Sequence, residues 1–519
     1  MLRPTRILPI LFGLSLILTG CIGATLPVPW PPLPTSIIIS PTPRPTVEAA
    51  TRLAATPVPT PAPSLSAQAV YAAALRPDGL RPAKTAGMTE YHLNVNVAPD
   101  LSGVSGQADI RYTNREATPL DTIYLHLYPN LWDGGMTVTE AQVDGKPVTA
   151  VYPSGDDVIG LPLAAPLAPG ESVDLALQFN VPVPSGEGVG NYGEFALQDG
   201  VLALAHFYPT VAVYDTGWRL ETPAPHGDVI FQDASLYDVT LTAPADLTVA
   251  ATGATLGKTD NGDGSATWRL GGGPMRDFNV VASRDYLSAS TLVGDMTVNS
   301  YFLPGDEAGG RKALDWAAQA LTIYQKEFGA YPYRELDIVE TATTAGGIEY
   351  PGLVVVASRL YSDANRKSFF ESATVHEVAH QWWYNVVGND QVNHPWLDEA
   401  LAQYATYRYF QDAYGDAGGK TFIESLDRRW TAVDQEDKPI GLPAGDYTAK
   451  EYGAIVYGRG PLFFIALRDR LGPDKMTELL RRYYAEQTWD IATPEELRAL
   501  AEEVAGTSLA DLWAEWVEP

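Results

Sequence analysis

Two histidines and a glutamate are spaced as ligands of a single metal ion. His376 and His380 flank Glu377 in the pattern H-E-x-x-H, and Glu399 follows after eighteen intervening residues. Side chains four positions apart share one face of a helix, so the two imidazoles can point at the same place. A second helical segment can bring the carboxylate of Glu399 to it. Two histidines and one glutamate form the ligand set of a catalytic zinc site whose fourth position is left for water.

Glu377 lies beside the first of these ligands, where its carboxylate can take a proton from that water. The chain contains only seven histidines. The motif with a third ligand at a suitable distance would therefore rarely arise by chance. We therefore predict one catalytic zinc ion held by His376, His380 and Glu399, with Glu377 as the general base. A structural metal and a site that has lost its activity are the alternatives.

The acidic composition argues against a nucleic-acid partner. The chain has 35 basic and 63 acidic residues, a net charge of −28, whereas a phosphate backbone needs a basic face. Its 519 residues, 45% of them hydrophobic, are enough for two or three domains with sizeable cores. The composition does not indicate an oligomeric state.

The first 21 residues have the features of an export signal. Arg3 and Arg6 precede an apolar run over residues 7–18, which is too short to span a bilayer. The run leads into LTGC at residues 18–21, which resembles a bacterial lipobox, and Cys21 is the chain's one cysteine. We expect residues 1–21 to be a lipoprotein signal peptide and Cys21 to carry the lipid that anchors the exported protein outside the cell membrane. An ordinary secretory signal is the alternative.

The next segments differ from one another in pattern. Residues 22–66 are rich in Pro and Thr, which predicts a disordered, extended tether, and residues 67–87 form a short lead-in. Apolar and polar residues then alternate, which predicts half-buried strands, and an NGDG turn separates two of them. The alternation is clearest over residues 91–97, 173–181 and 237–241. We predict an all-β N-terminal domain, a sandwich or saddle, over residues 88–290.

Residues 291–519 are predicted to form the catalytic domain. A helix with apolar spacing over residues 313–328 precedes two strand-like segments, at residues 336–340 and 346–357, and then the metal helix. The end of the chain is mostly helical, with helices predicted over residues 460–471, 475–486, 494–505 and 508–517. This order indicates a thermolysin-like α/β zinc peptidase domain with a mainly helical C-terminal lobe.

Three motifs together resemble the aminopeptidase N family of zinc metallopeptidases, the gluzincins that include leukotriene hydrolases. The first is the metal motif itself with its eighteen-residue spacing. The second is the family's G-x-M-E-N segment, present here as GGIEY at residues 346–350. The third is the family's tyrosine in a Y-x-K-G context, present here as YGRG at residues 457–460. Good matches cover about residues 305–470, and the β domain fits more loosely.

The resemblance implies catalytic roles for two of the matched residues. Glu377 would act as general base and then pass its proton to the leaving amine. Tyr457 would donate a hydrogen bond to the tetrahedral oxyanion, with Tyr452 as the competing candidate.

The second motif implies a substrate with a free amino end. Glu349 would bind the α-amino group and so restrict cleavage to the first peptide bond. The backbone of Gly346 and Gly347 would run beside the bound peptide, because the missing side chains permit close approach. The family also uses a glutamine from the β domain, and the best match here places His206 at that position, as a substrate-binding or a structural residue.

Three functions remain open at this point. The first is a zinc aminopeptidase that removes N-terminal residues from peptides. The second is a zinc endopeptidase of the same fold, since many relatives continue into a helical domain that encloses the site and this sequence ends at Pro519. The third is a non-catalytic, tethered binding lipoprotein.

Overall fold

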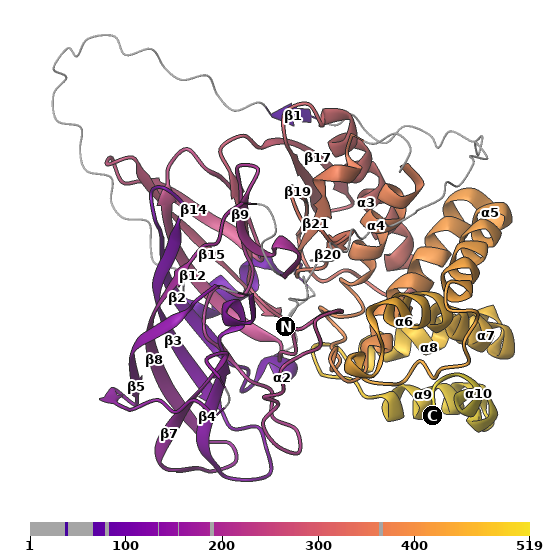
Figure 1. The fold of residues 1–519 in the computed structure, drawn as a ribbon, viewed down its shortest axis with the longest axis horizontal. Helices are drawn as coiled ribbons and strands as arrows, with labels where there is room; N and C mark the ends of the chain where they lie inside the picture. The colour runs from indigo at the N-terminus through magenta and orange to yellow at the C-terminus, as the bar shows by residue number, and fades with distance from the viewer. Residues whose placement is uncertain are drawn as a thin grey trace, which may run out of the picture. The chain divides into compact units, whose positions relative to one another are not determined.

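The computed structural model describes residues 37–39, 66–77, 82–132, 134–153, 155–186, 191–362 and 367–518. The described chain has a β-rich N-terminal part and a second part in which a smaller sheet is followed by helices (Figure 1). This is the predicted fold class. The lipidation candidate Cys21 lies outside the described residues, as does most of the predicted tether.

The largest sheet of the N-terminal part has the strand order β14-β15-β12-β2-β3-β8-β5-β6. In β2 and β8 every second side chain is buried, which confirms the predicted alternation. The NGDG turn connects β14 and β15 as predicted. The strand bounds are β2 Glu90–Val97, β3 Gly103–Thr113, β5 Thr137–Val143, β6 Lys146–Pro147, β8 Ser172–Pro182, β12 Ser235–Pro244, β14 Ala254–Asp260 and β15 Ser265–Met275.

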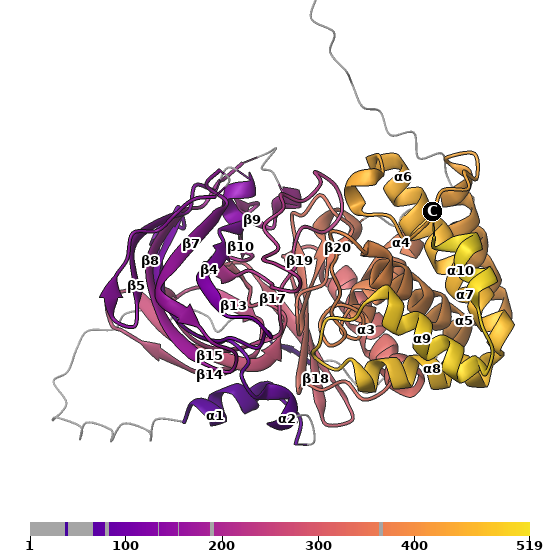
Figure 2. The ribbon, with the colours of Figure 1, turned by 90° about the horizontal axis from the view of Figure 1, so that it is seen from below.

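Two smaller sheets complete this part, in the orders β11-β4-β7 and β13-β16-β10-β9. Their buried residues, among them Leu125, Ile159 and Leu202, share one hydrophobic core with Leu93 of β2 and Leu177 of β8. Figure 2 shows β4 and β7 inside the curve of the large sheet. The bounds are β4 Leu120–His126, β7 Val158–Leu167, β9 Phe195–Gln198, β10 Val201–Leu204, β11 Thr210–Val211, β13 Thr248–Ala251 and β16 Val280–Ser283.

The sheet of the second part has the order β1-β17-β18-β19-β21-β20. Its strand β17 spans Leu287–Val293 and pairs with β18 along its whole length, so the boundary predicted at residue 290 falls inside a strand of the second part. Within the predicted tether, β1 (Ile37–Ile39) pairs antiparallel with β17. The other bounds are β18 Met296–Phe302, β19 Glu335–Thr341, β20 Gly347–Ile348 and β21 Leu353–Ala357.

Helix α3 (Glu307–Glu327) packs on β17 and β18 and begins six residues before the predicted start. Its first turns contain Gly309 and Gly310, which made the sequence look like a turn. A Cβ on Gly310 would lie 2.1 Å from the ring of Phe302, so glycine is required there for the helix to approach the sheet. The helix therefore starts at residues whose type serves packing rather than helix propensity.

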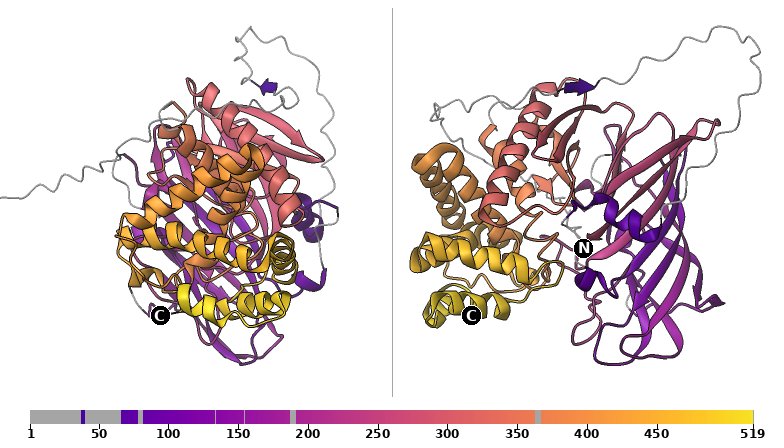
Figure 3. Two further views of the ribbon diagram at one scale, coloured as in Figure 1. Left: turned by 90° about the vertical axis from the view of Figure 1, so that its right-hand side faces the viewer. Right: turned by 180° about the vertical axis from the view of Figure 1, so that it is seen from behind.

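The remaining helices follow the metal motif, and the last four lie close to the predicted ranges (Figure 3). Pro473 and Pro494 occupy the first turns of α8 and α9, where a missing N–H costs nothing, and Thr493 caps α9 with Glu496. The bounds are α4 Lys367–Ala379, α5 Glu399–Thr431, α6 Ala449–Ala454, α7 Gly460–Leu471, α8 Pro473–Glu486, α9 Pro494–Ala505 and α10 Ala510–Trp516.

The lead-in and one arginine connect the two parts. Helix α1 (Ala67–Tyr71) and the turn η1 (Ala72–Ala74) pack on β15, and α2 covers Pro82–Thr85. The buried guanidinium of Arg276, just after β15, donates to the carbonyl oxygens of Gln232, Tyr384, Asn385 and Asp490, at 3.0 to 3.4 Å. Arg276 therefore holds the segment that follows His380 against the β part.

Candidate active site

Helix α4 carries His376 and Glu377, and His380 follows one residue after the helix ends. The His380 N–H still donates to the His376 carbonyl at 3.3 Å, so the four-residue spacing keeps its helical geometry. The Nδ1 of His380 lies 2.8 Å from the carbonyl oxygen of Trp383. A proton on that nitrogen leaves the Nε2 lone pair free toward the cluster, as in the histidine ligands of metalloproteins.

Glu399 is the first residue of α5, which confirms the predicted second helix. The side chain of Asp398 accepts from the Glu399 N–H at 2.7 Å and so caps the helix. Gln391 in turn donates to the other Asp398 oxygen at 2.7 Å. This chain of hydrogen bonds fixes the start of α5, and with it the position of the third ligand.

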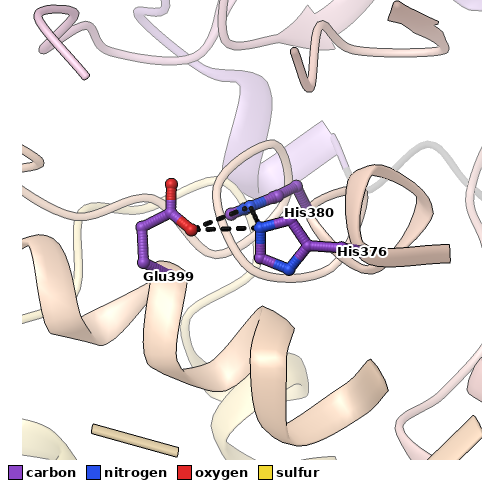
Figure 4. Close-up of side chains that lie close together, drawn as sticks. All are labelled: His376, His380 and Glu399. Atoms are coloured by element: carbon purple, nitrogen blue, oxygen red, sulfur yellow. Dashed lines mark hydrogen bonds and ion pairs between the residues drawn. The ribbon is translucent and has the colours of Figure 1, made fainter. Parts of the chain in front are cut away.

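The three predicted ligands converge on one point (Figure 4). The Nε2 atoms of His376 and His380 lie 3.2 Å apart, and Glu399 Oε2 lies 3.1 Å from the first and 3.5 Å from the second. Donor atoms at 2.0 to 2.2 Å from a tetrahedral zinc ion lie about 3.4 Å from one another. The cluster is buried, and within the described part of the chain it is the one group of donors with this geometry. The residues therefore fit one zinc ion.

The electrostatics of the cluster favour a cation. Burial lowers the pKa of His380, but the carboxylates of Glu399, Glu349 and Glu377 outweigh it and raise that pKa well above its usual value. Burial by itself would raise the pKa of Glu399, but His380 and His376 outweigh burial and hold that pKa well below the usual range. The surroundings thus stabilise both a negative Glu399 and a positive charge among the ligands.

The carboxyl group of Glu377 packs against the strand that carries the GGIEY motif. A Cβ on Gly347 in β20 would lie 2.4 Å from Glu377 Oε1, so glycine is required there. By contrast, a Cβ on Gly346 would meet Phe369 at an ordinary 3.4 Å. Burial, with the added charges of Glu349 and Glu399, raises the pKa of Glu377 well above its usual value. A raised pKa suits a carboxyl group that accepts a proton and later returns it.

Glu349 is buried one residue after β20 and lies in the same acidic environment. Gln391 Nε2 donates to its Oε1 at 3.3 Å, and its pKa is raised by burial, which outweighs the opposing charge of His380. Gln381, next to the second ligand, donates to the carbonyl of Tyr350 at 3.0 Å. The turn with Glu349 is therefore tied directly to the segment that follows α4.

Tyr457 lies in a single π-helical turn, η8 (Ile455–Arg459), between α6 and α7. Its ring is 6.0 Å from that of His376, and Tyr452 packs behind it at 5.8 Å. Burial and the charge of Glu399 raise the pKa of Tyr457, which keeps its hydroxyl protonated as a donor. Cβ atoms on Gly458 and Gly460 would approach α5 to 3.0 and 2.7 Å, so both glycines serve close packing.

A small cavity beside the cluster contains Glu349 and His206, together with Asp228, a residue that the sequence reasoning missed. His206 is buried, accepts from Gln232 at 3.3 Å, and has its pKa lowered to about 3 by burial, so it is neutral. Asp228 is close to the cluster, and its burial, with the charges of Glu349 and Glu399, raises its pKa well above the usual value. Asp228 lies in an irregular segment of the β part, where no periodicity or motif marks it.

A much larger cavity, of about 550 Å³, opens between the β part and the C-terminal helices. Arg115, Arg219, Asp390 and His394 are among its lining residues. It contains none of the predicted site residues, so its size does not identify the reacting site.

Comparisons with known proteins agree with the motifs. Residues 312–516 match the model of the Peptidase family M1 domain. Aminopeptidase M1-B from rice is 28% identical over 251 residues, which are 46% of this chain and 29% of that protein. Aminopeptidase 2 from Candida albicans is 23% identical over 404 residues, 72% of this chain and 42% of that protein. The chain thus spans less than half the length of these relatives.

Solved structures show the same fold. The M1 zinc metallopeptidase of Deinococcus radiodurans aligns with a TM-score of 0.64 at 21% identity, over 84% of this chain and 95% of that one. A mutant of that protein bound to the peptide Tyr-Ser-Ala aligns with a TM-score of 0.63 at 20% identity, over 85% of this chain and 97% of that one. Together these matches confirm the resemblance to the aminopeptidase N family of zinc metallopeptidases and the two-part fold.

Proposed function

We propose that this chain, whose residues 312–516 form a Peptidase family M1 domain, is a zinc-dependent aminopeptidase. The observation that carries the proposal is that the buried carboxyl group of Glu349 is within electrostatic reach of His380 and Glu399 of the buried cluster, and Gln391 joins it to Asp398 beside Glu399. The cluster supports peptide hydrolysis, and a fixed anion next to it supports recognition of an ammonium group. When bound, zinc would polarise the scissile carbonyl and lower the pKa of a water molecule.

The protein's own groups would move the proton and hold the peptide. Glu377 would accept the proton of the attacking water and return it to the leaving amine, a role that its raised pKa supports. Glu349 would pair with the α-ammonium group and place the first peptide bond at the cluster. Tyr457 would donate a hydrogen bond from its hydroxyl group to the oxygen that becomes negative as the carbonyl is attacked.

The test compares alanyl peptides that have a free amino end with the same peptides after N-acetylation. We expect cleavage of the free peptides one residue at a time, loss of activity with a chelator, and recovery on addition of zinc. Equal cleavage of acetylated peptides would instead identify an endopeptidase. Cleavage that persists at full rate without metal would refute the zinc mechanism.

We also propose that the protein is exported and anchored by a lipid on Cys21. The sequence of residues 1–21 supports this. No helix among the described residues is long and apolar enough to cross a membrane. In a bacterial host, the protein should incorporate a labelled fatty acid and partition into detergent, and Cys21→Ser should abolish both. Labelling that survives the substitution would refute the anchor.

A further inference from the structure

Two consecutive residues of the β part hold the segment that follows His380. Arg276 and Asp277 come directly after β15, and both are buried. The Arg276 guanidinium donates to the carbonyl oxygens of Tyr384 and Asn385, at 3.3 and 3.4 Å. The carboxylate of Asp277 accepts a hydrogen bond from the Tyr384 hydroxyl group. Tyr384 is therefore held both by its backbone and by its side chain.

Tyr384 has a backbone conformation that a tyrosine rarely adopts. Its φ is +140°, a value that favours glycine, so the conformation costs free energy and persists only where the surroundings enforce it. The Tyr384 side chain is buried, and the Asp277 carboxylate that accepts from it is itself fixed by the side-chain amide of Asn279 at 2.6 Å. The hydrogen bond between Tyr384 and Asp277 thus helps to enforce this turn.

The strained turn contains the carbonyl group that orients a metal ligand. Trp383 directly precedes Tyr384, and its carbonyl oxygen lies 2.8 Å from Nδ1 of His380. This carbonyl belongs to the peptide unit that joins the two residues, so a change in φ of Tyr384 turns it. The N–H of Asn385 donates to the His380 carbonyl at 3.0 Å, which closes the turn on the ligand. A shift of the turn would therefore move the acceptor that fixes the His380 ring.

The same loop is shaped around Arg276 further along the chain. A Cβ on Gly388 would lie 2.3 Å from Arg276 Cζ, so glycine is required there while the guanidinium keeps its hydrogen bonds. The Gly388 N–H donates to the Asp490 carbonyl at 3.0 Å, and Arg276 donates to the same oxygen at 3.2 Å. The loop after His380 is thus closely fitted to the β part.

We propose that Asp277 and Tyr384 are positioning residues for the metal, which hold the Trp383 carbonyl so that His380 keeps its proton on Nδ1 and its Nε2 free for zinc. This inference rests on the zinc site of the proposed function. The β part then contributes to zinc affinity, although all three predicted ligands lie in the second part. Loss of the groups that orient a ligating histidine typically weakens metal binding by roughly 10- to 100-fold.

A purely structural role for this pair makes a different prediction. Loss of the buried hydrogen bond would then destabilise the zinc-free and the zinc-loaded protein equally and leave the zinc affinity unchanged. Tyr384 also lines the small cavity that contains Glu349, so activity alone does not separate an effect on the metal from an effect on the substrate. Zinc affinity measured without substrate separates the two.

The experiment measures the Kd of the full chain for zinc by competition with a chromogenic chelator, and the melting temperature of the zinc-free protein. Tyr384→Phe removes the hydroxyl group and keeps the ring, and it should raise the Kd about tenfold. Asp277→Asn places an amide N–H against one of two donors and should also raise it. The double variant should bind zinc about as weakly as Tyr384→Phe alone, because both changes remove one contact.

Two matched controls remove similar buried groups elsewhere. Tyr331→Phe removes a buried hydroxyl group that donates to the Glu335 carbonyl at 2.9 Å. Asp337→Asn replaces a buried carboxylate that accepts from the Asn299 amide at 2.8 Å. Both should lower the melting temperature of the zinc-free protein and leave the Kd for zinc unchanged.

A Kd within about twofold of wild type in Tyr384→Phe would overturn the inference, and so would an equal rise in Tyr331→Phe. Tyr384→Phe nearly conserves the volume of the side chain, so it decides the question even if Asp277→Asn does not fold. Failure of the wild-type chain to bind zinc would instead refute the proposed function.

Discussion

The two sides of the metal cluster are built differently. On one side, Glu349 is held by Gln391, which also binds the helix cap Asp398, so the carboxylate is part of a hydrogen-bonded framework. On the other side, Tyr457 packs between the rings of His376 and Tyr452, and the guanidinium of Arg429 makes a cation–π contact with it. The difference shows that hydrogen bonds hold the first side, whereas ring contacts hold the second.

The largest expected effect comes from the group between the two sides. In Glu377→Gln both binding sides remain, but no carboxylate accepts the proton, so kcat should fall on the order of 10³-fold. Metal analysis should still find one zinc per chain, because the ligands are unchanged. Activity within tenfold of wild type would contradict the role of Glu377 as general base.

Tyr457→Phe tests the side that carries Arg429. Removal of one donor to a developing oxyanion should lower kcat about 100-fold with a small change in KM. Tyr452→Phe is the control, since Tyr452 packs behind Tyr457 and its buried hydroxyl has no hydrogen-bond partner among the residues that the structure describes. A greater loss in Tyr452→Phe than in Tyr457→Phe would reverse the assignment of the two tyrosines.

Glu349→Gln tests the other side. Loss of a buried charge pair with the α-ammonium group should lower kcat/KM for free peptides by roughly 30-fold or more. Any slow cleavage of N-acetylated peptides should be unaffected, which provides the internal control. If both kinds of peptide lost activity equally, Glu349 would be a structural residue and the two sides would not differ in the proposed way.

The smallest effect on activity is expected at Arg459, whose two terminal nitrogens make four hydrogen bonds. Arg459→Gln removes several buried hydrogen bonds at once, which should destabilise the protein by about 3 kcal/mol and lower its melting temperature by several degrees. The kcat of the folded variant for free peptides should stay within about threefold of wild type. Arg428→Gln, on the surface, should leave the melting temperature nearly unchanged. A loss of kcat in Arg459→Gln as large as that in Tyr457→Phe would contradict a purely structural role for Arg459.

Features that depend on local spacing could be predicted from the sequence. The burial alternation of β2, the range of α9 with its Thr493 cap, and the convergence of His376 with His380 all arise within a few residues. The bounds of an element were predicted less accurately where close packing, rather than helix propensity, decided the residue type. The predicted start of α3 is too late because Gly309 and Gly310 lower the helix propensity of its first turns, although Gly310 permits contact with Phe302 of the sheet and Gly309 with Tyr361.

The sequence by itself determined the predictions of the ligands and the general base, and the family resemblance, because these residues occur at characteristic intervals. The tertiary structure decided which charges surround them. Asp228 comes from the irregular part of the β region, Gln391 from a loop and Arg429 from the end of a long helix, and none belongs to a repeating pattern. A local pattern encodes the direction of a side chain within its own element, but an electrostatic field depends on distances between segments that only the folded chain brings together.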